Sequence, residues 1–118
     1  MSGPSTTALE SLEWETVDAL VRKKVVDGRS ITLTRYSFKA GGRFPHHVHD
    51  QEQVTMVIAG RLTFVAEGVD HVLEQGSVIV IPSGLPHSAE AGPDGAEVVS
   101  VVSPARTEGR GMTMLEEE

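Results

Sequence analysis

Glycine-rich turns recur at short intervals along the chain, and this spacing constrains the fold more than any other feature. Turn sequences follow one another every 8–12 residues or less, among them Asp27-Gly28, Gly41-Gly42 and Gly92-Pro93-Asp94-Gly95. No ten-residue stretch after Phe38 has the apolar periodicity of a helix. Short segments between closely spaced turns are typical of an all-β sandwich or barrel. We expect strands over residues 21–26, 31–38, 46–49, 53–59, 62–66, 71–73, 78–81, 87–91 and 97–103.

The length of 118 residues suits one domain and is too short for two separate cores. Residues 1–12 are expected to form a loosely ordered N-terminal segment, because they are small, polar or weakly patterned. We place the barrel at residues 13–107. Residues 108–118 have no core pattern and are expected to form a flexible acidic tail.

Charge and composition limit the partners of this chain. Ten basic and seventeen acidic residues give a net charge of −7, which argues against nucleic acid and anionic membranes as partners. No apolar run approaches the ~20 residues of a membrane-spanning helix, and no secretion signal is visible. The sequence has no cysteine, which excludes thiolate metal ligands. We therefore expect a cytoplasmic protein with a small-molecule substrate.

Three histidines and a glutamine form the main chemical motif. His47 and His49 are two residues apart on an expected strand, so their side chains share one face while His46 points to the other. Gln53 follows four residues later, and Glu52 beside it should face the opposite side. His87 comes directly after a Pro- and Gly-rich turn that fixes its backbone. His47, His49, Gln53 and His87 are thus candidate ligands of one metal ion.

The expected ligand set is neutral, so a divalent ion keeps its full charge. It suits Zn, Ni, Fe, Mn or Cu and does not distinguish among them. Because imidazoles bind metals only when deprotonated, affinity is expected to fall as the pH drops through ~6.5.

Two blocks of the sequence resemble the two motifs of the cupins. Gly41, His47-Val48-His49, Gln53 and Gly60 are spaced like the first motif, in which a Glu usually stands at the position of Gln53. Gly76, Pro82-Ser83-Gly84 and His87 are spaced like the second. The resemblance implies a single-domain cupin, a jelly-roll-like double-stranded β-helix barrel, and it implies that the three histidines and Gln53 bind the metal.

Within the cupins the chain is similar to the pectin-degradation proteins that linearise unsaturated uronates. The likeness rests on Trp14-Glu15, residues 21–26, Phe38-Lys39, residues 47–53 and Ser103-Pro104-Ala105-Arg106. The resemblance implies an inward Asp and an inward aromatic residue where this chain has Ser100 and Val102, and an Arg that it retains as Arg106. Without that Asp and aromatic residue, we expect weak turnover of uronates.

Strand parity also predicts the interior. It places Thr55, Val57, Ala89, Ala91, Ser100 and Val102 on the metal side, together with either Tyr36 and Phe38 or Arg35. Arg106 and Tyr36 are candidate catalytic residues. The candidate substrate-binding residues are Arg106, Ser100, Val102 and Phe38.

Three functions fit these features. The first is a metal-dependent enzyme for isomerisation, tautomerisation, cyclisation or lyase chemistry on a small oxygenated substrate, as in polyketide cyclases that resemble this chain. The second is an Fe(II)-dependent dioxygenase, and the third is a non-catalytic cupin that binds a small ligand. Val54, Met56 and Ile58 fall opposite the metal side, where their apolar surface predicts a homodimer.

Overall fold

Strands form nearly all the regular structure of residues 3–106 and 113–115, the part of the chain that this computed structural model describes. One 3₁₀ turn, η1 (Leu9–Ser11), precedes them, and no helix in these residues is long and apolar enough to cross a membrane. The strands are β1 (Glu15–Thr16), β2 (Val21–Asp27), β3 (Thr32–Phe38), β4 (Arg43–Val48), β5 (Glu52–Ala66), β6 (Val69–Glu74), β7 (Val78–Ile81), β8 (His87–Ser103) and β9 (Thr113–Met114).

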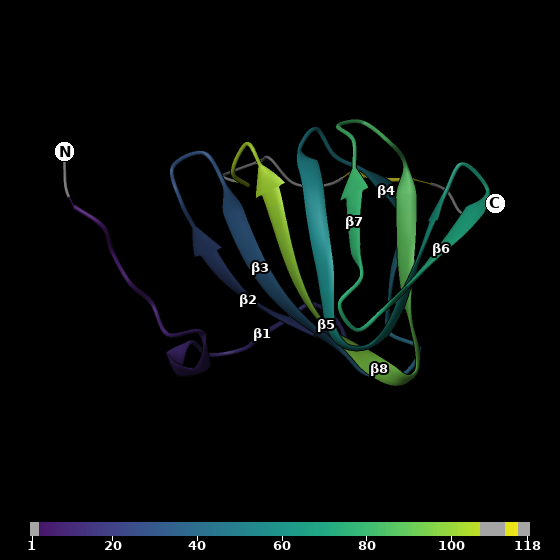
Figure 1. Ribbon diagram of the computed structural model, residues 1–118, viewed down its shortest axis with the longest axis horizontal. Helices are drawn as coiled ribbons and strands as arrows, with labels where there is room; N and C mark the ends of the chain where they lie inside the picture. The colour runs from purple at the N-terminus through teal and green to yellow at the C-terminus, as the bar shows by residue number, and fades with distance from the viewer. Residues whose placement is uncertain (1–2, 107–112, 116–118) are drawn as a thin grey trace.

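Two long strands, β5 and β8, connect the two halves of a sheet that curls around the core (Figure 1). Their first paired stretch includes Thr55 opposite Ser100, and their second includes Phe64 opposite Ala89. The first stretch continues through β3, β2 and β1 on one side and β7 on the other. The second lies between β4 and β6. The all-β fold predicted from the sequence is confirmed.

The sequence wrongly predicted that β5 and β8 would each be two shorter strands. Gly60 pairs with Ala96, and the next pair is Leu62 with Ala91, so residues 92–95 of β8 stand opposite a single residue of β5. The turn-forming residues therefore produce a bulge at which the sheet bends, while the backbone on both sides stays in the ladder.

The bend requires glycine at two positions where the chains cross closely. Gly60 and Gly95 have φ values of 78° and 75°, in the left-handed region. A Cβ at Gly60 would collide with the carbonyl oxygen of Gly95, and a Cβ at Gly95 would collide with the carbonyl oxygen of Phe38. The bend thus positions the two halves of the sheet against each other.

The core lies on the inner face of the curled sheet. Along β3 the side chains alternate between buried and half-buried, and Tyr36 and Phe38 are buried. Arg35 lies on the outer face, where its Nη2 is 2.6 Å from Glu97 Oε1. The alternative that the sequence left open is therefore decided in favour of Tyr36 and Phe38. The hydrophobic core comprises Val21, Tyr36, Phe38, Val57, Leu62, Phe64, Leu73, Ile81, Ala89, Ala91, Ala96 and Val98.

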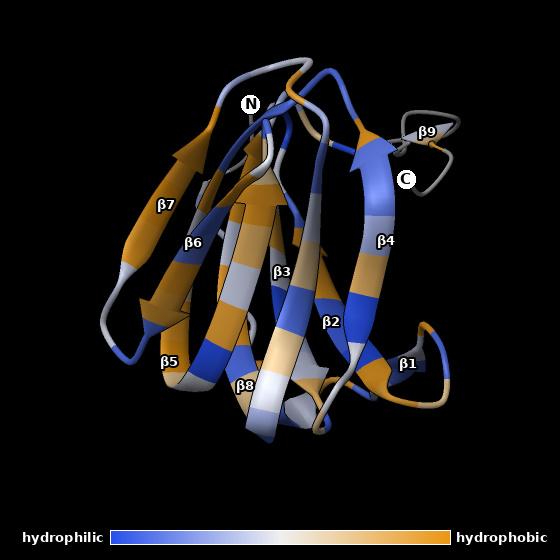
Figure 2. Cartoon of the chain, turned by 90° about the vertical axis from the view of Figure 1, so that its right-hand side faces the viewer, coloured by the Kyte–Doolittle hydropathy of each residue, from blue (hydrophilic) through white to orange (hydrophobic). Residues whose placement is uncertain are grey.

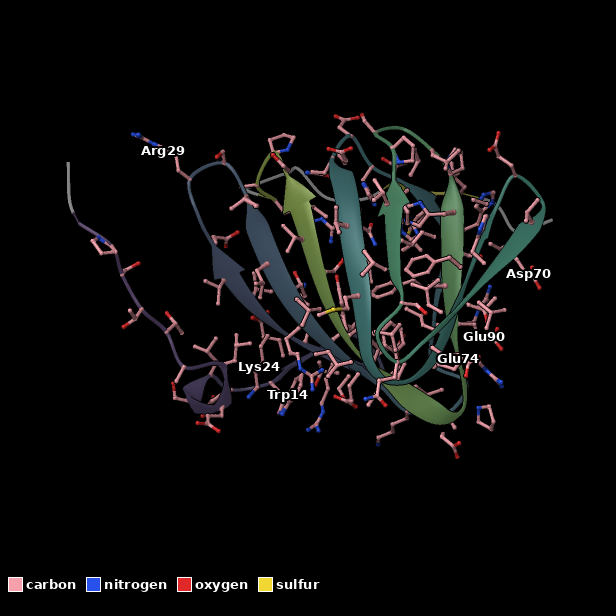
Figure 3. All side chains as sticks on the ribbon, in the orientation of Figure 1. Trp14, Lys24, Arg29, Asp70, Glu74 and Glu90 are labelled. Atoms are coloured by element: carbon pink, nitrogen blue, oxygen red, sulfur yellow. The ribbon has the colours of Figure 1, made fainter. Side chains whose placement is uncertain are left out.

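Both terminal segments contact the sheet. Lys24 Nζ lies 4.6 Å from the ring centre of Trp14 and donates a hydrogen bond to the Leu9 carbonyl oxygen at 2.9 Å, beside the start of β1 (Figure 3). Residues 113–115 lie along β4, with Met114 paired to His47, which the sequence pattern did not predict. The rest of the expected tail, residues 108–112 and 116–118, lies outside the described residues.

Gly60→Ala is expected to lower the free energy of unfolding by about 2 kcal/mol or more, because it adds a steric collision to the strain of a positive φ. Gly68→Ala is the matched control: its φ is 73°, but a Cβ there meets nothing within 4 Å. It should cost only about 1 kcal/mol. Urea unfolding measures both, and equal losses would contradict the crossing described here.

Candidate metal centre

Three imidazoles from two segments meet at one end of the curled sheet. His47 lies on β4, His49 follows that strand, and His87 opens β8, where it pairs with His47. One ring nitrogen from each lies within 4.8 Å of the other two, an arrangement that could hold a metal ion. All three are buried, as expected for ligands that face a protein interior.

Backbone carbonyl groups fix the orientation of each ring. The Nδ1 atoms of His47, His49 and His87 lie 2.7, 3.0 and 2.8 Å from the carbonyl oxygens of Pro45, Gln51 and Leu85. A carbonyl oxygen only accepts, so each neutral ring carries its proton on Nδ1 and keeps the Nε2 lone pair free. Such hydrogen bonds are the usual means of orienting metal-binding histidines.

Gln53, at the start of β5, adds an oxygen to this cluster. Its Oε1 lies 2.9 Å from His49 Nε2, and its Nε2 donates to Thr55 Oγ1 at 2.8 Å. Two lone pairs therefore face each other, which is unfavourable unless a cation lies between them. The donor set of three imidazole nitrogens and one amide oxygen fits a divalent transition metal.

Burial keeps the imidazoles neutral. Desolvation lowers the pKa of His47 to about 4 and also lowers the pKa values of His49 and His87. The positive charge of Arg106 acts on all three in the same direction. From the sequence we predicted that metal affinity decreases as the pH drops through ~6.5. Because burial lowers the histidine pKa values, we now expect this decrease at lower pH.

A cavity of about 30 Å³ adjoins the histidines. That volume accepts about two water molecules, or the carboxylate end of a larger molecule. Tyr36, Phe38, Phe44 and Phe64 form its aromatic wall, and the ring centres of Tyr36 and Phe44 are 5.2 Å apart. Its other lining residues are His47, Gln53, Thr55, Leu62, His87, Ala89, Val98, Ser100 and Arg106.

Arg106 brings a positive charge to this cavity. Its Nη1 donates to the Tyr36 hydroxyl oxygen at 3.4 Å, and its backbone N–H donates to Thr32 Oγ1 at 2.8 Å. Its Nε is buried and has no hydrogen-bond partner among the described residues. A buried guanidinium N–H without an acceptor is costly unless a ligand supplies one.

Most of the residues predicted for the site lie around this cavity. Tyr36, Phe38, Ser100 and Arg106 line it, whereas Val102 is buried but does not. Outside the three-histidine cluster, Glu52 and His71 are exposed and His46 is half-buried.

Phe44 and Phe64 were not predicted to line the site. Counting every second residue from His47 and from Gln53 gives the wrong inward-facing residues, because the pairing register shifts along both strands. The shift in β4 lies between Phe44 and His47, and the shift in β5 lies at the bend. The alternation of Leu62, Phe64 and Ala66 with more polar neighbours was the signal that could have located Phe64.

The profile of the cupin domain matches residues 34–102. The chain belongs to the cupin family. Among solved structures it resembles KdgF from Halomonas sp. at 23% identity, with a TM-score of 0.82 over 90% of this chain and 97% of that one. An RmlC-like cupin from Shewanella frigidimarina gives 23% identity and a TM-score of 0.82 over 90% and 96% of the two chains.

The polyketide cyclase RemF from Streptomyces resistomycificus is 20% identical, with a TM-score of 0.81 over 98% of this cupin and 88% of RemF. At these identities the likeness shows the fold alone. A search among curated proteins finds no match.

Without metal, this cupin should lose stability as the pH falls from about 6.5 towards 4. The unfolded chain takes up protons at the ordinary histidine pKa, whereas the folded chain resists protonation of His47 until about pH 4. The unfolded state then binds more protons, so the free energy of unfolding decreases with decreasing pH. Urea unfolding across this range measures the slope, which should be smaller in His47→Gln. An equal slope in both proteins would contradict the account.

Proposed function

We propose that this cupin binds one divalent transition metal ion through His47, His49, His87 and Gln53. The proposal is supported by one ring nitrogen from each of the three histidines, all within 4.8 Å of one another, and by the amide oxygen of Gln53, which lies 2.9 Å from His49 Nε2. Zn, Ni, Fe, Mn and Cu all accept such ligands.

The substrate is a small molecule with an anionic oxygen, such as a keto acid. This proposal rests on Arg106, which lines the cavity and whose buried Nε has no hydrogen-bond acceptor among the described residues. Within the described part of the chain no carboxylate side chain lines the cavity, and the labelled Asp70, Glu74 and Glu90 lie away from it on β6 and β8 (Figure 3). A carboxylate would pair with the guanidinium in a bidentate manner.

The reaction that these residues support is proton transfer next to a carbonyl group, the common step of tautomerisation, isomerisation and cyclisation. A bound metal ion supplies Lewis acidity that stabilises the negative charge of an enolate. Arg106 orients the substrate carboxylate. Tyr36 lines the cavity, and its hydroxyl oxygen accepts from Arg106 Nη1, so the hydroxyl proton is available for donation. The aromatic wall limits water near the reacting carbon.

Binding without turnover is the second candidate. It is favoured by the lack of a carboxylate among the described lining residues, since Asp and Glu are frequent general bases. Ser100 lines the cavity at the position where the resemblance to the pectin-degradation cupins implies an Asp.

Single replacement of His47, His49 or His87 by Ala should abolish tight metal binding, because each removes one of four ligands. Gln53→Ala should weaken binding less, and Gln53→Glu should retain it. His46→Ala is the control on the same segment and should bind normally. Metal content after dialysis, measured by inductively coupled plasma mass spectrometry, distinguishes these outcomes. Loss of metal in His46→Ala with retention in His47→Ala would overturn the assignment.

The metal-loaded protein should exchange the protons beside the carbonyl of small keto acids with solvent deuterium, followed by proton NMR. Tyr36→Phe should slow this exchange by roughly 10²–10⁴-fold, because a general acid or base contributes about that much. Arg106→Gln should mainly raise KM. If the keto acids bind but no exchange occurs, the second candidate replaces the first.

We also propose that this cupin is a homodimer that uses the outer face of the sheet. The pairing registers align Val26, Leu33, Val101, Val54 and Val80 in one row across β2, β3, β8, β5 and β7. Val54 and Val80 are 41% and 57% exposed, and Figure 2 shows β7 as hydrophobic along its length. The row is uncharged, so a two-fold axis can place it against the same row of a second copy.

Light scattering at micromolar concentration should give the mass of a dimer. Val54→Glu should give a monomer, because the dimer would bury an unpaired charge. Val72→Glu is the control: Val72 is 55% exposed but lies on β6, outside the row. A monomeric wild-type protein, or dissociation by both variants alike, would refute this interface.

A further inference from the structure

A chain of three side chains leads from the metal centre into the cavity. Gln53 Nε2 donates to Thr55 Oγ1 at 2.8 Å, and Thr55 Oγ1 lies 2.6 Å from Ser100 Oγ. Thr55 and Ser100 are directly paired across β5 and β8, and both line the cavity. Gln53 is therefore connected to a hydroxyl group that a ligand can contact.

The amide group of Gln53 sets the direction of these hydrogen bonds. An amide nitrogen only donates, so Thr55 Oγ1 must accept from it. Thr55 is 1% exposed, and among the described residues its hydroxyl contacts only Gln53 Nε2 and Ser100 Oγ. Ser100 Oγ lies within hydrogen-bond distance of the Thr55 hydroxyl, and because Thr55 is less exposed than Ser100, at 1% against 5%, we take Thr55 as the donor of this pair.

With Thr55 as the donor, the hydroxyl proton of Ser100 has no hydrogen-bond acceptor among the described residues. Ser100 is 5% exposed, and Thr55 is the only hydrogen-bond partner of its hydroxyl among the described residues. Having accepted from Thr55, Ser100 can donate only into the cavity. Arg106 and Tyr36, whose side chains also carry hydrogen-bond donors, line the same cavity.

We infer that Ser100 is a specificity-determining residue that donates a hydrogen bond to an anionic oxygen of the ligand, and that Gln53 makes it a donor through Thr55. This inference rests on the proposed function, since a metal ligated by Gln53 takes the amide oxygen and leaves the amide nitrogen to Thr55. The substitution Gln53→Glu would reverse the direction of the hydrogen bonds between residue 53, Thr55 and Ser100. The new carboxylate would accept from Thr55, Thr55 would accept from Ser100, and the Ser100 proton would be withdrawn from the cavity.

The test measures the affinity of acetate for the Co(II)-loaded full chain from its visible absorption spectrum. Ser100→Ala should weaken acetate binding roughly tenfold or more, as expected for a hydrogen bond to a charged group. In a Gln53→Glu background, Ser100→Ala should change the affinity less than twofold. The negative charge added by Gln53→Glu weakens acetate binding by itself. That charge does not explain why Ser100→Ala would then have no effect on the acetate affinity. The double-mutant cycle therefore reports the direction of the hydrogen bonds between Gln53, Thr55 and Ser100.

Ser88→Ala is the matched control, since Ser88 lies on β8 but outside the lining of this cavity, and it should leave the affinity unchanged. Melting temperature and cobalt content verify that each variant is folded and loaded. An equal loss in both backgrounds would overturn the direction set by Gln53, and no loss in either would overturn the contact with Ser100. In both cases the metal site and the anionic substrate stand. If acetate does not bind the loaded wild-type protein, the proposed function fails together with this inference.

Discussion

The candidate metal centre depends on three hydrogen bonds between imidazoles and the backbone. Each Nδ1 atom is bonded to a carbonyl oxygen two residues away, at Pro45, Gln51 or Leu85. These bonds fix the tautomer locally, within the segment that carries the histidine. Burial then keeps the rings neutral, with His47 held to a pKa of about 4. A site built in this way could hold a cation with little reorganisation of its ligands.

The bend in β5 and β8 brings together residues of the metal centre and the cavity that are far apart in the sequence. Because Gly60 and Gly95 cross without side chains, the two strands pass from one half of the sheet to the other. One stretch of β8 begins at His87, and the other carries Ser100 opposite Thr55. The same two strands therefore contribute to the metal centre, to its hydroxyl chain and to the wall of the cavity.

Much of this was predictable from the sequence. The turn spacing predicted the all-β fold, and the motif spacing identified the side chains that gather at the centre, because glycine turns and strand parity are local properties. The continuity of β5 and β8 and the inward positions of Phe44 and Phe64 were not predictable in this way. They depend on register shifts, which are set by how the strands pair and not by their own sequences. The direction of the chain from Gln53 to Ser100 likewise needed three-dimensional neighbours.

We propose that three histidines and a glutamine of this cupin hold one divalent metal ion. X-ray absorption spectroscopy of the zinc-loaded protein measures which ligands surround the ion. We predict one zinc ion per chain, with three imidazole rings at a Zn–N distance of about 2.0–2.1 Å and an additional oxygen ligand. A spectrum with fewer imidazoles, or with oxygen ligands only, would contradict the account.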